Sequence, residues 1–191
     1  MMIDIQNSTD YRGIPLHNVG IKNYTLQMTI NGEHTLSTVQ FAVSLDAEHK
    51  GIHMSRLCRL LDSYSVLDNK NISELLTSAL NILEADFASI VIDSIYFRRK
   101  RAPVTNLPGM MGYKIRVSVT VSQSGTTIKH CISVPITAVC PCSKAISDFG
   151  AHNQRGCVCA TLIDIDVFDY DTIINIVEKQ AASCELYSIL K

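Results

Sequence analysis

The segment YKIRVSVTVS, residues 113–122, shows the clearest strand pattern in the chain. Its apolar residues occupy every second position, and polar residues occupy the positions between them. The apolar set is Ile115, Val117, Val119 and Val121, and the polar set is Lys114, Arg116, Ser118 and Thr120. Since successive side chains of a strand point to opposite faces, this segment predicts a sheet with one buried and one polar face. Such a sheet is typical of antiparallel pairing.

Further strands are expected on both sides of this segment. The predicted ranges are 21–30, 35–45, 88–97, 127–136 and 157–168. The first two are joined by Asn31-Gly32, which is the strongest short-range signal for a β-hairpin. Residues 1–20 contain Gly13 and Pro15 and show no regular period, so we expect an irregular arm there.

Helical spacing of leucine and other apolar residues predicts two helices between the second and third strands. The first covers residues 54–67, and the second follows Asn71 and extends to Leu83. Asp169 or Asp171 is expected to cap a third helix over residues 172–182, and residues 182–191 are expected to begin a fourth.

The order of these elements predicts an α+β protein with a repeated module. Two strands, two helices and two strands are followed by two strands and a helix. We therefore expect an arm at 1–20, a first module at 21–123 and a second module at 126–191 that is truncated before its final two strands. The repeat is one of elements and not of residues.

The overall composition indicates a globular protein. Hydrophobic residues make up 47% of the 191 positions, charged residues 18%, and the net charge is −1. This balance argues against a nucleic-acid partner and against disorder. Seven cysteines, a polar N-terminus and no apolar run of membrane-spanning length predict a cytoplasmic protein with reduced thiols and no membrane partner. The basic run at residues 98–101 fits either a solvated strand end or an anion-binding surface.

A loop between two expected strands contains Cys140, Cys142 and His152. Thiolate and imidazole are preferred ligands of zinc and similar ions, and three protein ligands suffice for a catalytic metal that keeps one position open for water. The same pattern also fits two ordinary thiols and a surface histidine. Cys157 and Cys159, which alternate along the next strand, are expected to face one side and to serve packing.

Cationic side chains accompany this loop. Lys144 and Arg155 suit an anionic, polar substrate such as a nucleotide. A second polar cluster at residues 50–56 includes His53 and Arg56 and lies at the start of the first expected helix. Backbone N–H groups at such a position favour phosphate, although the cluster fits a plain helix N-terminus equally well.

Several strings, in order along almost the whole chain, resemble the type IB GTP cyclohydrolases, metal-dependent enzymes of the first step of tetrahydrofolate synthesis. They are DYRGIP at 10–15, HMSR at 53–56, CPCSK at 140–144, GAHNQR at 150–155 and SCELY at 183–187. CPCSK followed by GAHNQR is highly specific. The resemblance implies a tunnelling fold (T-fold) with two tandem modules, and a homo-oligomer, usually a tetramer, with active sites at subunit interfaces.

The resemblance also implies a reaction and its residues. GTP is hydrolysed at C8 of guanine to give 7,8-dihydroneopterin triphosphate and formate. A divalent metal, which is manganese, zinc or iron, would be held by Cys140, His152 and Glu185. Cys140 would also act directly in catalysis, while Cys142 receives no role. The chemistry of cations further suggests Arg56, Lys144 and Arg155 as ligands of the triphosphate.

Two alternatives stay open at this point. One is another T-fold enzyme that handles a pterin or a deazaguanine with a catalytic cysteine and no metal. The other is a truncated, non-catalytic T-fold subunit, because members of the family continue past the position of Lys191. A metal requirement separates the first alternative from the cyclohydrolase, and formation of a fluorescent pterin separates the second.

Overall fold

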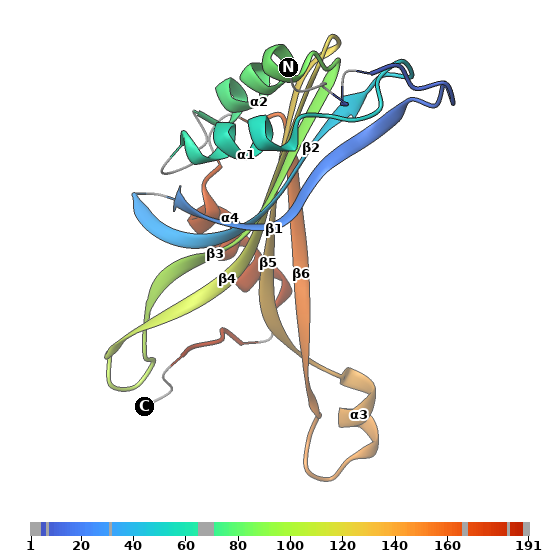
Figure 1. Ribbon diagram of the computed structural model, residues 1–191. Helices are drawn as coiled ribbons and strands as arrows, with labels where there is room; N and C mark the ends of the chain where they lie inside the picture. The colour runs from blue at the N-terminus through green and yellow to red at the C-terminus, as the bar shows by residue number, and fades with distance from the viewer. Residues whose placement is uncertain are drawn as a thin grey trace. The chain divides into compact units, whose positions relative to one another are not determined.

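The computed structural model describes residues 5–6, 8–30, 32–64, 71–165, 168–182 and 184–188. In these residues six strands form one sheet in chain order, accompanied by four helices (Figure 1). The strands are β1 (Leu16–Ile30), β2 (Glu33–Leu45), β3 (Phe87–Arg101), β4 (Pro108–Ser122), β5 (Gly125–Val139) and β6 (Asn153–Ile163). The helices are α1 (Met54–Asp62), α2 (Asn71–Leu83), α3 (Pro141–Ile146) and α4 (Tyr170–Ala181). The predicted α+β class is confirmed.

The alternating segment that predicted the sheet lies in β4 as expected. Tyr113, Ile115, Val117, Val119 and Val121 are all buried, with Tyr113 fully so. The residues between them are exposed or half-buried. Neighbouring strands β1, β2 and β3 pair antiparallel, as an alternating one-sided pattern predicts.

The strand β1 begins at Leu16 and therefore includes part of the segment expected to be irregular. The register with β2 shifts between Leu16 and Val19 and again between Ile21 and Tyr24, and Asn23 has a φ of 57°. Each such bulge inserts an unpaired residue and reverses the alternation beyond it. The regular period that identifies a strand was therefore missing from this part of the sequence.

The helices differ from the expectation in three places. The helix α1 ends at Asp62, and Ser63 and Tyr64 are not helical, while residues 65–67 lie outside the described residues. The helix α3 was not predicted, because six residues are too few to show a helical period. Described residues 184–188 are not helical, because Cys184 forms a β-bridge with Thr137. Asp169 caps α4 as predicted and accepts a hydrogen bond from the backbone N–H of Thr172 at 3.2 Å.

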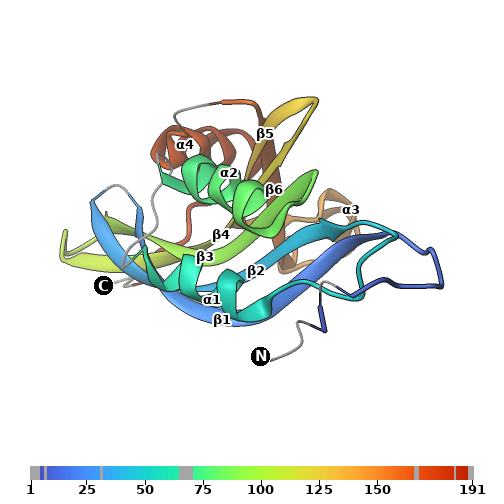
Figure 2. The same ribbon diagram turned by 45° about the horizontal axis from the view of Figure 1, so that its top comes forward.

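The chain divides into two compact units. Unit 1 comprises residues 1–94, 116–129 and 163–166, and unit 2 comprises residues 95–115, 130–162 and 167–191. In unit 1, α1 and α2 lie side by side (Figure 2) and bury leucines, among them Leu57, Leu61, Leu75 and Leu76. The buried residues Val39 and Phe41 of β2 belong to the same core.

Unit 2 is centred on aromatic side chains between α4 and the strands. Tyr96 of β3 stacks on Tyr170 at a ring distance of 5.1 Å. His130 of β5 stacks on Phe168, also at 5.1 Å, and its Nδ1 lies 3.3 Å from the hydroxyl of Tyr170. His130 is only 1% exposed, and this burial lowers its pKa below the ordinary value. Among the residues described, no helix has the length and apolar character needed to cross a membrane.

The substitution Leu75→Ala tests the unit 1 core. Leu75 is fully buried, so we expect a loss of about 2–5 kcal/mol in the free energy of unfolding, from lost transfer energy and the cavity left behind. The control is Leu36→Ala, the same change at a position 75% exposed, for which we expect less than about 0.5 kcal/mol. Urea denaturation followed by circular dichroism measures both, and equal losses would contradict the assignment of the core.

The buried His130 predicts a pH dependence of stability. Its folded pKa is lowered, so the unfolded chain binds a proton below pH about 6.5 that the folded chain resists. The contribution to stability is complete above about pH 6.5 and is lost as the pH falls toward the lowered pKa. We expect His130→Gln to remove this component, and the exposed-site control His17→Gln to retain it, in urea denaturation at pH 5.0 and 7.5. A wild-type slope in His130→Gln would refute it.

Candidate metal and substrate site

Cys140 and His152 lie at the two ends of the connection between β5 and β6. Cys140 follows Val139 at the end of β5 and is the N-cap of α3, and His152 precedes Asn153 at the start of β6. The backbone N–H of Cys140 donates to the carbonyl oxygen of His152 at 3.2 Å. Figure 1 shows α3 at the tip of this hairpin. The antiparallel pairing of β5 and β6 therefore brings the predicted cysteine and histidine ligands opposite each other.

Ser143 holds the two residues in this arrangement. Its hydroxyl donates to the carbonyl oxygen of Cys140 at 2.9 Å and accepts from the backbone N–H of His152, also at 2.9 Å. Gly150, with a φ of 94°, supplies a backbone turn that L side chains rarely adopt. The sequence reasoning had not assigned Ser143 a role, and its place in the CPCSK string was the only signal.

The environment of Cys140 favours the thiolate. Hydrogen bonds from the backbone N–H of Ser143 and then of Cys142 hold the pKa of the Cys140 thiol below its usual range, against a smaller effect of burial. Pro141 begins the helix immediately after Cys140, as is common at this position. A thiolate is both a nucleophile and a metal ligand. Cys142 is exposed on α3.

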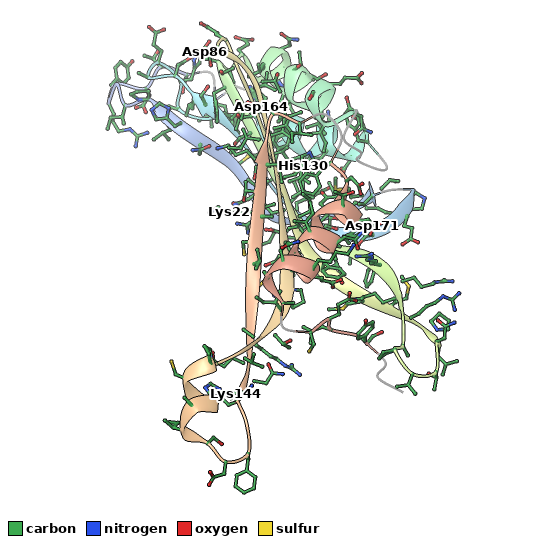
Figure 3. All side chains as sticks on the ribbon, turned by 180° about the vertical axis from the view of Figure 1, so that it is seen from behind. Lys22, Asp86, His130, Lys144, Asp164 and Asp171 are labelled. Carbon is green, nitrogen blue, oxygen red and sulfur yellow. The ribbon has the colours of Figure 1, made fainter. Side chains whose placement is uncertain are left out.

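Two of the predicted cations lie on the same hairpin. Lys144 is exposed on α3 (Figure 3), and its backbone N–H donates to the carbonyl oxygen of Cys140 at 3.4 Å. Arg155 is exposed on β6, three residues after His152. Both cations are therefore accessible to an anionic ligand on the hairpin that holds Cys140 and His152.

Glu185 lies on a short extended segment beside β5. Cys184 forms a β-bridge with Thr137 and accepts a hydrogen bond from its hydroxyl at 3.0 Å, which places Glu185 near the end of β5 that leads to Cys140. The carboxylate accepts a hydrogen bond from the hydroxyl of Tyr187 at 2.9 Å and lies 3.5 Å from Nζ of Lys100. These two neighbours, Tyr187 first, lower the pKa of Glu185 despite the opposing effect of burial. Ser183, in the same sequence string, lies outside the described residues.

Thiolate, imidazole and carboxylate are donors that suit zinc, manganese or iron, so the chemistry of the predicted set fits a divalent metal. The backbone brings all three residues toward one end of β5. Within the described part of the chain, however, no three histidine, cysteine, aspartate or glutamate side chains lie together as a metal cluster. The Glu185 side chain is instead engaged by Tyr187 and Lys100.

Arg56 belongs to unit 1 and not to this hairpin. It is exposed on α1, donates from its guanidinium group to the carbonyl oxygen of Ile82 at 3.4 Å and lines a cavity of about 30 Å³ with His49 and His53. The backbone N–H groups of Arg56 and Leu57 already donate to the carbonyl oxygen of His53. The first helical turn therefore uses these amides itself, and the guanidinium is the group of Arg56 that is left to meet an anion.

Cys157 and Cys159 correct one expectation. They do face the same side of β6, since Oγ of Ser133 lies 3.1 Å from one sulfur and 3.4 Å from the other. Both are exposed, so the prediction that they serve packing was wrong. The reason is that β6 is an edge strand, and its alternation does not reveal whether another element covers that face.

Comparisons with known proteins match the chain along its length. A sequence model of the family described as "Type I GTP cyclohydrolase folE2" matches residues 2–191. Three curated proteins named "GTP cyclohydrolase FolE2" show the range of similarity. The protein from Neisseria meningitidis serogroup C (strain 053442) is 35% identical, over 98% of this chain and 64% of its own length. Those from Paraburkholderia phymatum and Desulfosudis oleivorans are 37% and 39% identical, each over 100% of this chain and over 73% and 75% of their own lengths. The chain thus spans just under two thirds of the Neisseria relative.

The substitution Ser143→Ala tests how the hairpin is held. Without the hydroxyl, the amide of His152 loses its acceptor, and we expect this amide to exchange its hydrogen about fivefold faster, equivalent to about 1 kcal/mol for one hydrogen bond. The control is Ser147→Ala, since Ser147 accepts only from the nearby N–H of Phe149 among the bonds described in this loop. Amide exchange followed by NMR measures both. Unchanged exchange at His152 would show that Ser143 does not fix it.

Proposed function

The chain belongs to the family of type I GTP cyclohydrolases described as folE2, and on this premise we propose that it hydrolyses GTP at C8 of the guanine ring, with release of formate and formation of 7,8-dihydroneopterin triphosphate. The observation that carries the proposal is the match over residues 2–191, in which the two most specific strings form one hairpin. The product would enter tetrahydrofolate synthesis.

Cys140, His152 and Glu185 would hold the divalent metal ion. The direct support is the backbone pairing of Cys140 with His152 and the bridge that places Cys184 against Thr137. When bound, the metal supplies a Lewis acid that lowers the pKa of a coordinated water. The lowered pKa of Cys140 favours the charged form that metal binding requires.

Lys144 and Arg155 would bind the triphosphate, since both are exposed cations on the hairpin that holds Cys140 and His152. The guanidinium of Arg56 would supply a further cation from unit 1. Guanidinium groups bind phosphate oxygens through two parallel hydrogen bonds, while an ammonium group acts as a point charge. The two arginines would therefore orient the triphosphate and Lys144 would add charge.

The proposed assembly is a homotetramer of T-fold subunits with tandem modules. Two features support self-association. The sheet has free edges at β1 and β6, and free edges favour pairing with another chain. Ile146 and Phe149, on the connection between Cys140 and His152, are 89% and 101% exposed, which is unusual for large apolar side chains. All seven cysteines are free, which supports a cytoplasmic site of action.

The substitution Cys140→Ala tests the proposed function. We expect the wild-type chain to bind one divalent metal ion and to form a fluorescent pterin from GTP, and Cys140→Ala to lose the metal and at least 100-fold in activity. Metal analysis and pterin fluorescence are the measurements. The control Cys157→Ala removes an exposed thiol on β6 and should change neither. A wild-type chain without metal, or a variant that keeps it fully, would refute the metal site.

A metal-independent reaction at Cys140 is the second candidate, and the lowered pKa of this thiol favours it. Metal removal separates the two. If a chelator abolishes pterin formation and added Mn²⁺ or Zn²⁺ restores it, the metal-dependent reaction is supported. If activity survives chelation but not Cys140→Ala, the thiol itself performs the chemistry.

A further inference from the structure

The basic run at the end of β3 does not lie in solvent as a whole. Arg99 and Arg101 are exposed, while Lys100 is only 9% exposed and Arg98 is half-buried. Strand alternation turns Arg98 and Lys100 to the face that carries the buried Tyr96. These two cations therefore enter the interior of unit 2, where the sequence gave no reason to expect charge.

The ammonium group of Lys100 is fully engaged. Its Nζ donates to Oε1 of Glu178 at 2.8 Å and to the carbonyl oxygen of Leu186 at 2.8 Å. It also lies 3.5 Å from Oε2 of Glu185 and 4.6 Å above the centre of the Tyr187 ring. An ammonium group has three hydrogen-bond donors, so three consecutive residues of one segment share this cation with Glu178.

The other end of this contact is fixed by α4. Glu178 is 5% exposed and also accepts a hydrogen bond from the hydroxyl of the fully buried Tyr113 at 3.0 Å. Arg98 adds a weaker contact to Glu178 at 3.9 Å and donates to Asn175 of α4 at 2.7 Å. A buried carboxylate requires such partners, because an unpaired charge in the interior is costly. The position of Nζ of Lys100 is thus determined by α4 and β4, independently of the segment it binds.

The segment of Glu185 is held on one side by β5 and on the other by Lys100. Thr137 binds the backbone of Cys184, and Lys100 binds the backbone of Leu186, so Glu185 lies between two anchored residues. We infer that Lys100 is a positioning residue that fixes the Glu185 segment beside the Cys140 hairpin. The metal-related part of this inference rests on the proposed function.

The distances distinguish this role from that of a competitor for the carboxylate. Lys100 makes its short contacts with Glu178 and with the Leu186 carbonyl, and the longer one with Glu185. The Glu185 side chain remains 44% exposed. Lys100 therefore secures the backbone of the segment and leaves the carboxylate accessible. This also explains why Glu185, a lone acid in sequence, has a defined location.

Hydrogen exchange followed by mass spectrometry tests the anchoring in the metal-free chain. We expect Lys100→Met to accelerate exchange in residues 184–188 about tenfold, and Lys100→Arg to restore most of the protection because it keeps the charge. The control Arg99→Met makes the same charge change at the exposed neighbouring position and should leave exchange unchanged. Wild-type exchange in a folded Lys100→Met chain would overturn the inference.

Zn²⁺ affinity, measured by competition with a chelating dye, tests the consequence for the metal. Loss of an outer partner of a metal ligand typically weakens binding 10- to 100-fold, and we expect Lys100→Met to fall in this range, Lys100→Arg to bind more tightly than Lys100→Met, and Arg99→Met to match the wild type. Equal affinity in Lys100→Met and wild type would overturn the role at the metal. A wild-type chain that binds no Zn²⁺ would refute the proposed function instead, and hydrogen exchange alone would then decide the anchoring.

A second variant covers the case in which Lys100→Met does not fold. Tyr187→Leu removes the ring beneath Nζ and the hydrogen bond to Glu185, at a half-buried position that leaves the Lys100–Glu178 pair intact. We expect it to accelerate exchange in residues 184–188 and to weaken Zn²⁺ binding at least threefold. A folded Tyr187→Leu chain with wild-type exchange and affinity would contradict the arrangement of this segment.

Discussion

The alternation of side chains along β3 constrains both units of the protein. This strand carries Ala88, Ile90 and Ile92 on its buried face in unit 1, and Tyr96 and Lys100 on the same face in unit 2. A strand changes face only through a bulge, and the described pairing of β3 with β2 is regular. A cation at position 100 must therefore point inward, and the interior must supply its partner.

That partner is Glu178, and the pair shows what a buried ion pair contributes. Bringing two charges out of water costs about as much as their attraction returns, so the net effect on stability is small. Its effect on arrangement is larger, because only one placement of α4 satisfies Glu178, Lys100 and Tyr113 together. The remaining donors of Lys100 then determine where residues 185–187 lie. The basic run thus serves internal organisation, which neither of the two interpretations from sequence had foreseen.

Sequence reasoning succeeded where a feature is local and periodic. The alternation at residues 113–122 and the cap at Asp169 were both predicted and observed. It failed where the period is broken or too short, in the bulged start of β1 and in α3. The exposed Cys157 and Cys159 show a different limit, since alternation reports which residues share a face but not what covers it. The candidate site divides in the same way. Cys140 and His152 were recognisable from one loop, whereas Glu185 required the resemblance to a family.

The reason for this division is the sequence separation of the contacts that build each part. Ser143 and His152 are 9 residues apart, so the hairpin that carries the cysteine and histidine is held by bonds within one connection. Glu185 is placed by contacts that span 47 residues to Thr137 and 86 residues to Lys100. Closing longer loops costs more entropy and occurs later in folding, so the hairpin can form before the acid arrives. The three predicted ligands then meet only after α4 has docked on β3 through Glu178. Metal binding would in this way report completion of unit 2, because the third ligand is supplied by its last long-range contacts.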